Sequence, residues 1–95
     1  MATITAMDLA NLNPDVYTFA SPRVFNNTGA LLLNSLLPNI NRIYNTEDLI
    51  PNLPPFSQEN GQYYTHTGIN VPFTLNLGTF FGNHVTAYWI FVNYL

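Results

Sequence analysis

The sequence predicts an α/β protein with a mostly parallel sheet, and only a part of one. Residues 16–19 and 40–44 are rich in β-branched and aromatic side chains, and a helical stretch precedes each of them. The resulting order of helix, strand, helix, strand, long loop and helix is typical of βαβ units. Two strands cannot make a sheet buried on both faces, and no strand precedes the first helix. We therefore expect residues 1–95 to form one incomplete domain, a piece of a larger one.

Local patterns define the first half of the chain. Residues 2–12 place Ile4 and Met7 at helical spacing, and the helix is predicted to end before Pro14. Residues 16–19 are predicted to form a strand buried on both faces, because their apolar side chains do not alternate cleanly. A loop over residues 22–27 and an apolar helix over residues 28–38 complete this half.

The second half contains less regular structure. Residues 40–44 form the second predicted strand, and residues 51–61 form a loop. Residues 62–68 and 70–78 are predicted to be short β or irregular segments. From Asn83 onward, apolar residues recur with helical periodicity, which predicts an amphipathic helix. We expect its apolar stripe to face the core: Val85, Tyr88, Trp89 and Val92.

Composition excludes several kinds of partner and site. The chain has no lysine, its net charge is −3, and its two cations, Arg23 and Arg42, are expected in a loop and at a strand edge. Nucleic acids and anionic membrane surfaces need clusters of cations, so neither is an expected partner. No apolar run is long enough for a transmembrane segment. Without cysteine, and with His66 and His84 lacking metal-ligand spacing, no metal or cofactor is expected, and the compartment is not determined.

One carboxylate and one imidazole occupy positions where catalytic groups gather. Functional side chains of open α/β sheets lie on loops past the carboxyl ends of strands. Asp48 follows the strand at 40–44, and His84 opens the last helix. An acid followed by a histidine is the order of the second and third members of an α/β-hydrolase triad. The same residues also fit a surface turn at Asp48 and a packing role for His84, and His66 is expected to be structural.

Several stretches, taken in order, resemble the class 3 (fungal-type) lipases. These are "YTFASPRVFN", "RIYNTEDLIPNLPP", "YYTHTG" and "NHVTAYW", and together they cover nearly the whole chain. The resemblance implies the C-terminal half of an α/β-hydrolase fold. It also implies a lipase-like carboxylic ester hydrolase of lipid metabolism, with a Ser-Asp-His triad and a lipid or other ester substrate in the full-length enzyme.

The resemblance assigns roles to individual residues. Asp48 matches the catalytic aspartate and His84 the catalytic histidine, whereas His66 matches a non-catalytic segment. The "SPR" segment, Ser21 to Arg23, is structural in this reading, and Phe25 departs from the glycine usual in that motif. Glu47 is expected to face solvent, and the loop after Asp48 is expected to be restricted by prolines: Pro51, Pro54 and Pro55.

The nucleophile of that family is missing from the sequence. The serines Ser21, Ser35 and Ser57 do not stand in a G-x-S-x-G elbow. We therefore expect this chain alone to be inactive toward esters. The sequence would then be a truncated gene model or a gene fragment that begins just past the elbow. The alternative is a non-catalytic truncated paralogue that acts as a structural or interaction module. In either case, exposed sheet edges are expected to favour oligomers or aggregation.

Overall fold

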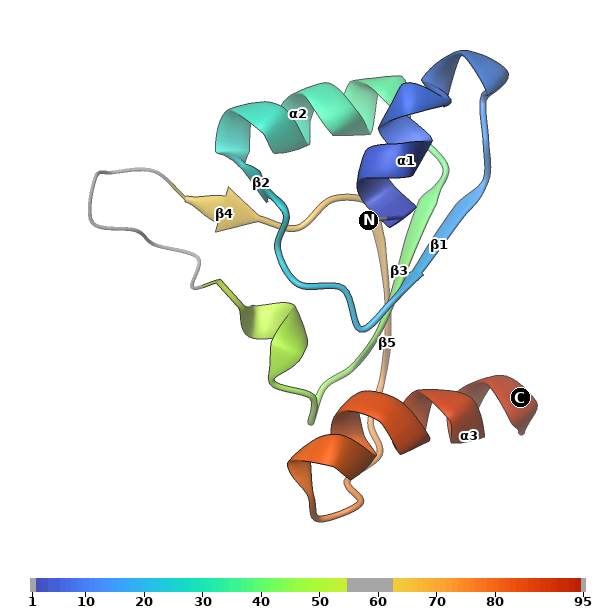
Figure 1. Ribbon diagram of the computed structural model, residues 1–95, viewed down its shortest axis with the longest axis vertical. Coiled ribbons are helices and arrows are strands. Elements are labelled where there is room, and N and C mark those ends of the chain that lie inside the picture. The colour runs from blue at the N-terminus through green and yellow to red at the C-terminus, as the bar shows by residue number, and fades with distance from the viewer. Residues whose placement is uncertain (1, 55–62, 95) are drawn as a thin grey trace.

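A three-stranded parallel sheet forms the centre of the structure (Figure 1). The computed structural model describes residues 2–54 and 63–94. Strand β3 (Ile40–Asn45) lies between β1 (Val16–Phe19) and β5 (Ile69–Phe73), and it is parallel to both. A parallel sheet with helices between its strands confirms the predicted α/β class.

The remaining elements are short. They are α1 (Ala2–Asp8), the 3-10 turns η1 (Ala10–Leu12) and η2 (Ile50–Asn52), the antiparallel pair β2 (Phe25–Asn26) and β4 (Tyr64–Thr65), α2 (Asn27–Leu36), and the π-helical turn η3 (Gly82–Thr86) that continues into α3 (Ala87–Asn93). Helices α1 and α2 lie toward the end of the sheet where β3 begins (Figure 1). Helix α3 crosses the opposite end, where β3 and β5 finish, and it therefore lies near the loop that carries Asp48.

One face of the sheet carries the hydrophobic core. Val16 of β1 lies opposite Ile40 of β3, so the two side chains share a face. Both are buried against α1, α2 and the residue that follows α2, through Ala6, Leu33 and Leu37. Burying an aliphatic side chain of this size contributes roughly 1.5–3 kcal/mol. This cluster therefore holds the two helices and the sheet together.

The other face of the sheet is largely open, which corrects the prediction that residues 16–19 are buried on both sides. Buried and exposed positions alternate along β1, with Tyr17 60% and Phe19 46% exposed. Ile69 of β5 is exposed on the same face. Among the described elements, only α3 covers part of this face, beside the carboxyl ends of β3 and β5. There Phe91 stacks on Phe73 with ring centroids 4.2 Å apart. No second layer therefore reaches the β1 side chains in the described part of the chain.

The first helix is shorter than predicted. Helix α1 ends at Asp8, and the 3-10 turn η1 follows it up to Leu12. Asn13 then adopts a left-handed conformation with φ 51°, which asparagine tolerates better than most residues, immediately before Pro14. The buried positions of α1 are Thr3 and Ala6, whereas Ile4 is exposed. Helical spacing alone did not indicate which side of so short a helix faces the sheet.

Strand β5 is a full strand rather than an irregular segment. Its register with β3 is set by the turn at Gly68, whose φ is +92°. A Cβ atom at this glycine would lie 2.6 Å from Cγ2 of Ile40, so a side chain cannot fit there. Pro72 is tolerated because β5 is an edge strand of the described sheet. The alternating apolar residues Ile69, Val71 and Phe73 were the signal for this strand.

Arg42 was predicted to be a charge at a strand edge, but it is a buried residue of the central strand. Its side chain is 7% exposed. The Nε and Nη2 atoms donate to Oδ1 of Asn70 at 3.2 and 2.7 Å, and the guanidinium lies 4.2 Å from the ring centroid of Tyr44. The prediction was wrong because β5 adds a further strand beside β3 and supplies the amide partner.

The predicted apolar stripe of the last helix does not face the core. Val85, Trp89 and Val92 are exposed, and of the four predicted positions only Tyr88 is buried. The helix is oriented by Tyr88, whose hydroxyl reaches two buried polar groups at the end of β3. Leaving such groups unpaired would cost about 1–3 kcal/mol each, more than one aliphatic contact at the surface gains.

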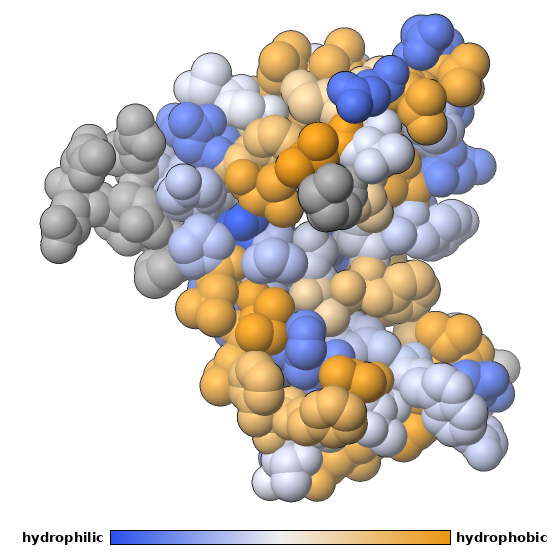
Figure 2. All heavy atoms as spheres, in the orientation of Figure 1, coloured by the Kyte–Doolittle hydropathy of each residue, from blue (hydrophilic) through white to orange (hydrophobic). Residues whose placement is uncertain are grey.

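Apolar side chains gather on the surface at the lower end of the molecule in Figure 2, where η2 and η3 lie. The exposed apolar residues of this region are Leu49, Leu53, Phe80, Phe81 and Val85. They surround the loop of Asp48 and the turn of His84. Both candidate residues therefore lie beside an apolar part of the surface.

Candidate active site

Asp48 lies on the loop that leaves the carboxyl end of β3. Its backbone N–H donates to the carbonyl of Asn45 at 3.0 Å, which closes a tight turn directly after the strand. Its Oδ1 atom accepts a hydrogen bond from the N–H of Ile50 at 3.0 Å. The residue is 2% exposed, whereas its neighbour Glu47 faces solvent as expected. The carboxylate is therefore directed inward by its own loop.

The "SPR" segment fastens the continuation of this loop. The N–H of Arg23 donates to the carbonyl of Leu53 at 2.7 Å. The Nη1 atom of Arg23 donates to the carbonyls of Asn52 and Pro54, at 2.6 and 2.9 Å. Among the described residues its partners are carbonyls rather than carboxylates. Arg23 thus ties the segment after β1 to the segment after Asp48.

His84 lies in the π-helical turn η3, where the N–H of Ala87 donates to the carbonyl of Gly82. Thr79 precedes the helical residues 80 and 81 that lead into this turn, and its hydroxyl accepts a hydrogen bond from the N–H of Gly82 at 2.9 Å, as helix-capping residues do. A Cβ atom at Gly82 would lie 2.8 Å from this hydroxyl oxygen, so the glycine permits the close cap. Single π-helical turns recur at functional sites.

The structure brings Asp48 and His84 together. The Nδ1 atom of His84 lies 2.9 Å from Oδ2 and 3.1 Å from Oδ1 of Asp48. The carboxylate side chain is fully buried, whereas 30% of the imidazole is exposed. A carboxylate only accepts hydrogen bonds, so Nδ1 carries a proton and Nε2 of the neutral ring is left as an acceptor.

Tyr88, one helical turn after His84, completes the surroundings of the carboxylate. Its hydroxyl donates to Oδ2 of Asp48 at 2.6 Å and accepts from the N–H of Asn45 at 3.0 Å. Burial raises the pKa of the Tyr88 hydroxyl, and the adjacent Asp48 carboxylate raises it further. The hydroxyl therefore keeps its proton and stabilises the negative charge of Asp48.

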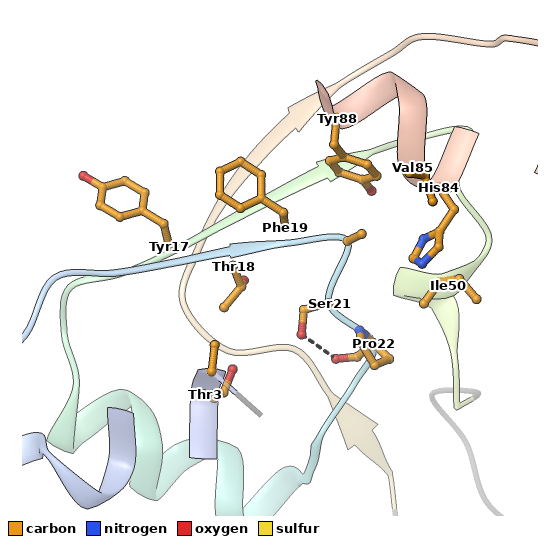
Figure 3. A pocket seen from close by; sticks show the side chains of 12 residues that line it. Thr3, Tyr17, Thr18, Phe19, Ser21, Pro22, Ile50, His84, Val85 and Tyr88 are labelled. Carbon is orange, nitrogen blue, oxygen red and sulfur yellow. Dashed lines mark hydrogen bonds between the residues drawn. The ribbon is translucent and has the colours of Figure 1, made fainter. Parts of the chain in front are cut away.

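The imidazole borders an open cleft of about 640 Å³ (Figure 3). Residues from α1, β1 and η3 line this cleft together with the residues that follow β1. Among them are Ala2 and Thr3, at the start of α1. The side of His84 that does not face Asp48 therefore has space for a reacting group, and the amino end of α1 borders the same space.

The comparison with known families decides what this chain is related to. A family model described as lipase (class 3) matches residues 1–58, which is more than half of the chain. The chain belongs to the class 3 lipase family. The matched region contains Asp48, whereas His84 lies beyond it. No solved structure matches the chain.

Class 3 lipase membership raises the question of a nucleophile. The hydroxyl of Ser21 donates to the carbonyl of Pro22 at 3.1 Å, although the residue lines the same cleft as His84 (Figure 3). The hydroxyl of Ser35 donates to the carbonyl of Leu32 within α2. Ser57 lies outside the described residues. Within the described part of this class 3 lipase chain, no serine is hydrogen-bonded to His84.

His66 stands apart from the Asp48–His84 pair. Its Nε2 atom is hydrogen-bonded to the carbonyl of Pro51, so it braces η2 rather than a catalytic partner. Burial, with a smaller contribution from the nearby Arg42 charge, lowers the pKa of His66 to about 4. The ring is therefore neutral at pH 7. Residues 2–54 and 63–94 contain no group of three potential metal ligands, and no helix in them is long and apolar enough to cross a membrane.

Two residues of the site were missed by sequence reasoning. Tyr88 was assigned to the apolar stripe because its ring suits a core position, and its spacing of four residues from His84 was the available signal for a shared helix side. Asn45 is fully buried and hydrogen-bonded to segments far along the chain. No local pattern marks it among the many asparagines of this sequence.

Proposed function

We propose that this chain is the C-terminal part of a carboxylic ester hydrolase with an α/β-hydrolase fold. Asp48 and His84 supply two of the three triad members. The observation that carries this proposal is the contact of 2.9 Å between Nδ1 of His84 and the buried Asp48 carboxylate, beside an open cleft. Membership of the class 3 lipase family supports an ester, such as a lipid, as the substrate.

The arrangement suits proton transfer at Nε2. Asp48 holds the ring in one orientation and one tautomer, which leaves Nε2 free to accept the proton of an attacking hydroxyl. The imidazolium that forms then lies directly against the carboxylate charge. The same proton can be returned from Nε2 to the departing alcohol. A general base positioned in this way typically contributes about 10²- to 10⁴-fold in rate.

The missing nucleophile would come from a segment joined to the start of α1. Ala2 and Thr3 border the cleft that His84 faces, so a serine placed just before them would approach Nε2. Without that serine and its oxyanion hole, the chain alone is expected to be inactive. A fluorophosphonate probe, which labels activated serines, should leave it unmodified; labelling of Ser21 would contradict this part of the proposal.

The function is tested by restoring the missing segment. The amino-terminal part of a class 3 lipase, ending in its nucleophile elbow, is joined in frame to Ala2, and hydrolysis of p-nitrophenyl butyrate is measured. Asp48→Asn should lower kcat by about 10⁴-fold, as expected for loss of the orienting acid. Glu47→Gln is the matched control, because this neighbouring carboxylate is exposed and should not affect kcat. Hydrolysis that tolerates both Asp48→Asn and His84→Ala would refute the proposed roles.

A second candidate function is an interaction module without catalysis. The open face of the sheet favours it, because Tyr17 and Phe19 expose large aromatic surfaces beside the outer edge of β1, which pairs with no other described strand. The fusion experiment separates the two candidates. One result favours the interaction module: the fused protein folds but is labelled poorly by the fluorophosphonate probe. The second result that favours it is loss of association with other chains in Tyr17→Thr and Phe19→Thr.

A further inference from the structure

We infer that Tyr88 and Asn45 together form a hydrogen-bonded bracket that positions Asp48 against His84. Neither residue would contact the substrate, so both are positioning residues. The inference deepens the proposed function and rests on it for its catalytic consequence. The structural part, that the bracket sets the state of the imidazole, can be tested without any hydrolysis.

The first arm of the bracket is the Tyr88 hydroxyl. The Oδ2 atom of Asp48 accepts two short hydrogen bonds, from the Tyr88 hydroxyl at 2.6 Å and from His84 at 2.9 Å. No arginine side chain is hydrogen-bonded to this carboxylate among the described residues, so hydrogen-bond donors balance its charge. With Tyr88 on one side, the carboxylate cannot rotate freely about its last bond, and its oxygen stays aimed at Nδ1.

The ring of Tyr88 is itself held in place. Its hydroxyl accepts a hydrogen bond from the N–H of Asn45 at 3.0 Å, at the last residue of β3. Its ring packs at a right angle against the ring of Phe73 in β5, with ring centroids 5.3 Å apart. The hydroxyl is therefore fixed by both strands, and a rigid donor orients the carboxylate better than a water molecule would.

The second arm is the Asn45 side chain, which joins three segments. Its amide nitrogen donates to the carbonyls of Leu75 and Asn83, at 2.8 and 3.1 Å. Its amide oxygen accepts from the N–H groups of Leu75 and Glu47, at 3.0 and 3.3 Å. Both donor hydrogens and both acceptor positions of the amide are used.

These bonds connect the two members of the pair through the backbone. Asn83 directly precedes His84, and Glu47 directly precedes Asp48. Asn45 therefore fixes the backbone on both sides of a contact between residues that are distant in sequence. Asn45→Asp would keep the size of the side chain but replace its donors with a charge facing two carbonyls, so it should separate the segments.

The tautomer of His84 reports on the bracket directly. Side-chain ¹⁵N–¹H correlation spectra of the chain at pH 7 distinguish a proton on Nδ1 from one on Nε2. We expect His84 to be protonated at Nδ1, with a low-field proton signal. Tyr88→Phe keeps the ring contact with Phe73 but removes the hydroxyl. It should broaden or lose the low-field signal and yield a mixture of tautomers.

Controls separate positioning from folding. His66 donates from Nε2 to the Pro51 carbonyl, so its opposite tautomer serves as an internal marker of the native fold. Tyr94→Phe is the matched control, because Tyr94 is exposed and lies past the end of α3. It should leave both histidine spectra unchanged. A folded Tyr88→Phe chain whose His84 spectrum equals that of the wild type would overturn the inference.

A measurement on the wild-type chain keeps the inference testable if the variants do not fold. The hydroxyl proton of Tyr88 and the Nδ1 proton of His84 point at the same oxygen, so a nuclear Overhauser effect between them is expected. Observation of both signals without that effect would overturn the bracket.

The catalytic consequence is measured in the serine-bearing fusion. Tyr88→Phe should lower kcat by about 10- to 100-fold with little change in KM, which is the cost of a slightly misplaced base. If the fusion is inactive while the tautomer results hold, the proposed function fails and the bracket stands. If the fusion is active and Tyr88→Phe retains the wild-type kcat, the bracket has no catalytic role.

Discussion

The Nδ1 atom of His84 lies 2.9 Å from Oδ2 of Asp48, although the two residues belong to elements that are distant in the sequence. Asp48 leaves the central strand, whereas His84 belongs to the helical segment that crosses its end. The contact depends on three supports: the turn after β3, the cap of η3, and the polar groups of Tyr88 and Asn45 between them. Substitutions that weaken these supports should therefore disturb the contact between Asp48 and His84.

Arg23→Gln should destabilise the chain by about 1–2 kcal/mol. The substitution removes the hydrogen bonds from the guanidinium to the carbonyls of Asn52 and Pro54, and hydrogen bonds from charged donors are the stronger ones. Urea denaturation followed by circular dichroism measures the change. Equal stability of Arg23→Gln and wild type would show that the "SPR" segment does not hold the loop after Asp48.

Asn70→Asp should stabilise the chain by about 1 kcal/mol. Arg42 is buried, and its hydrogen-bond partner is the neutral amide of Asn70, so a carboxylate there would pair with the buried charge. The gain is limited because Asn70 itself is exposed. Thermal unfolding of Asn70→Asp, compared with the exposed control Asn93→Asp, measures it. A lower Tm for Asn70→Asp than for the control would contradict the assignment.

The stability of the chain should fall as the pH falls from about 6.5 to about 4, because of His66. Burial and the Arg42 charge lower the pKa of His66 in the folded state to about 4, from an unfolded value near 6.5. Between these values the unfolded chain binds more protons than the folded one, so lowering the pH favours unfolding. The contribution should be about 1–2 kcal/mol once solvent contact of the ring is considered.

The His66 contribution can be isolated by substitution. In His66→Gln, the amide nitrogen can still donate to the Pro51 carbonyl but does not titrate. Urea midpoints measured between pH 4 and pH 7 should vary less with pH in this variant than in wild type. Identical pH dependence of the two proteins would show that His66 does not bind its proton more weakly in the folded state.

The open face of the sheet should make the isolated chain associate. Tyr17 and Phe19 are exposed on β1, whose outer edge has no partner among the described strands. Sedimentation velocity at increasing concentration should show oligomers, and Tyr17→Thr with Phe19→Thr should reduce them while preserving β-propensity. A concentration-independent monomer with a sharp two-state melt would contradict this expectation.

The sequence predicted the elements that local chemistry determines. Residues 16–19 carry a strand signal, and they form β1. Asp48 was predicted as a site residue because functional groups gather on loops past the ends of strands. His84 was predicted as its partner from its order after the acid and from the family resemblance, and the two side chains are in contact. Their catalytic roles stay a proposal. Which side of a strand or helix faces the core was predicted less well, because the partners of Arg42 and Tyr88 come from distant segments. Asn45 was missed for the same reason.

The measurement that tests the central claim most directly is the tautomer of His84 in wild type, Asp48→Asn and Glu47→Gln, read from side-chain ¹⁵N–¹H correlations of the isolated chain at pH 7. We predict a proton on Nδ1 in wild type and in Glu47→Gln, and loss of that single state in Asp48→Asn. A wild-type ring protonated at Nε2, or an Asp48→Asn spectrum identical to that of wild type, would contradict the claim that the buried carboxylate orients this imidazole.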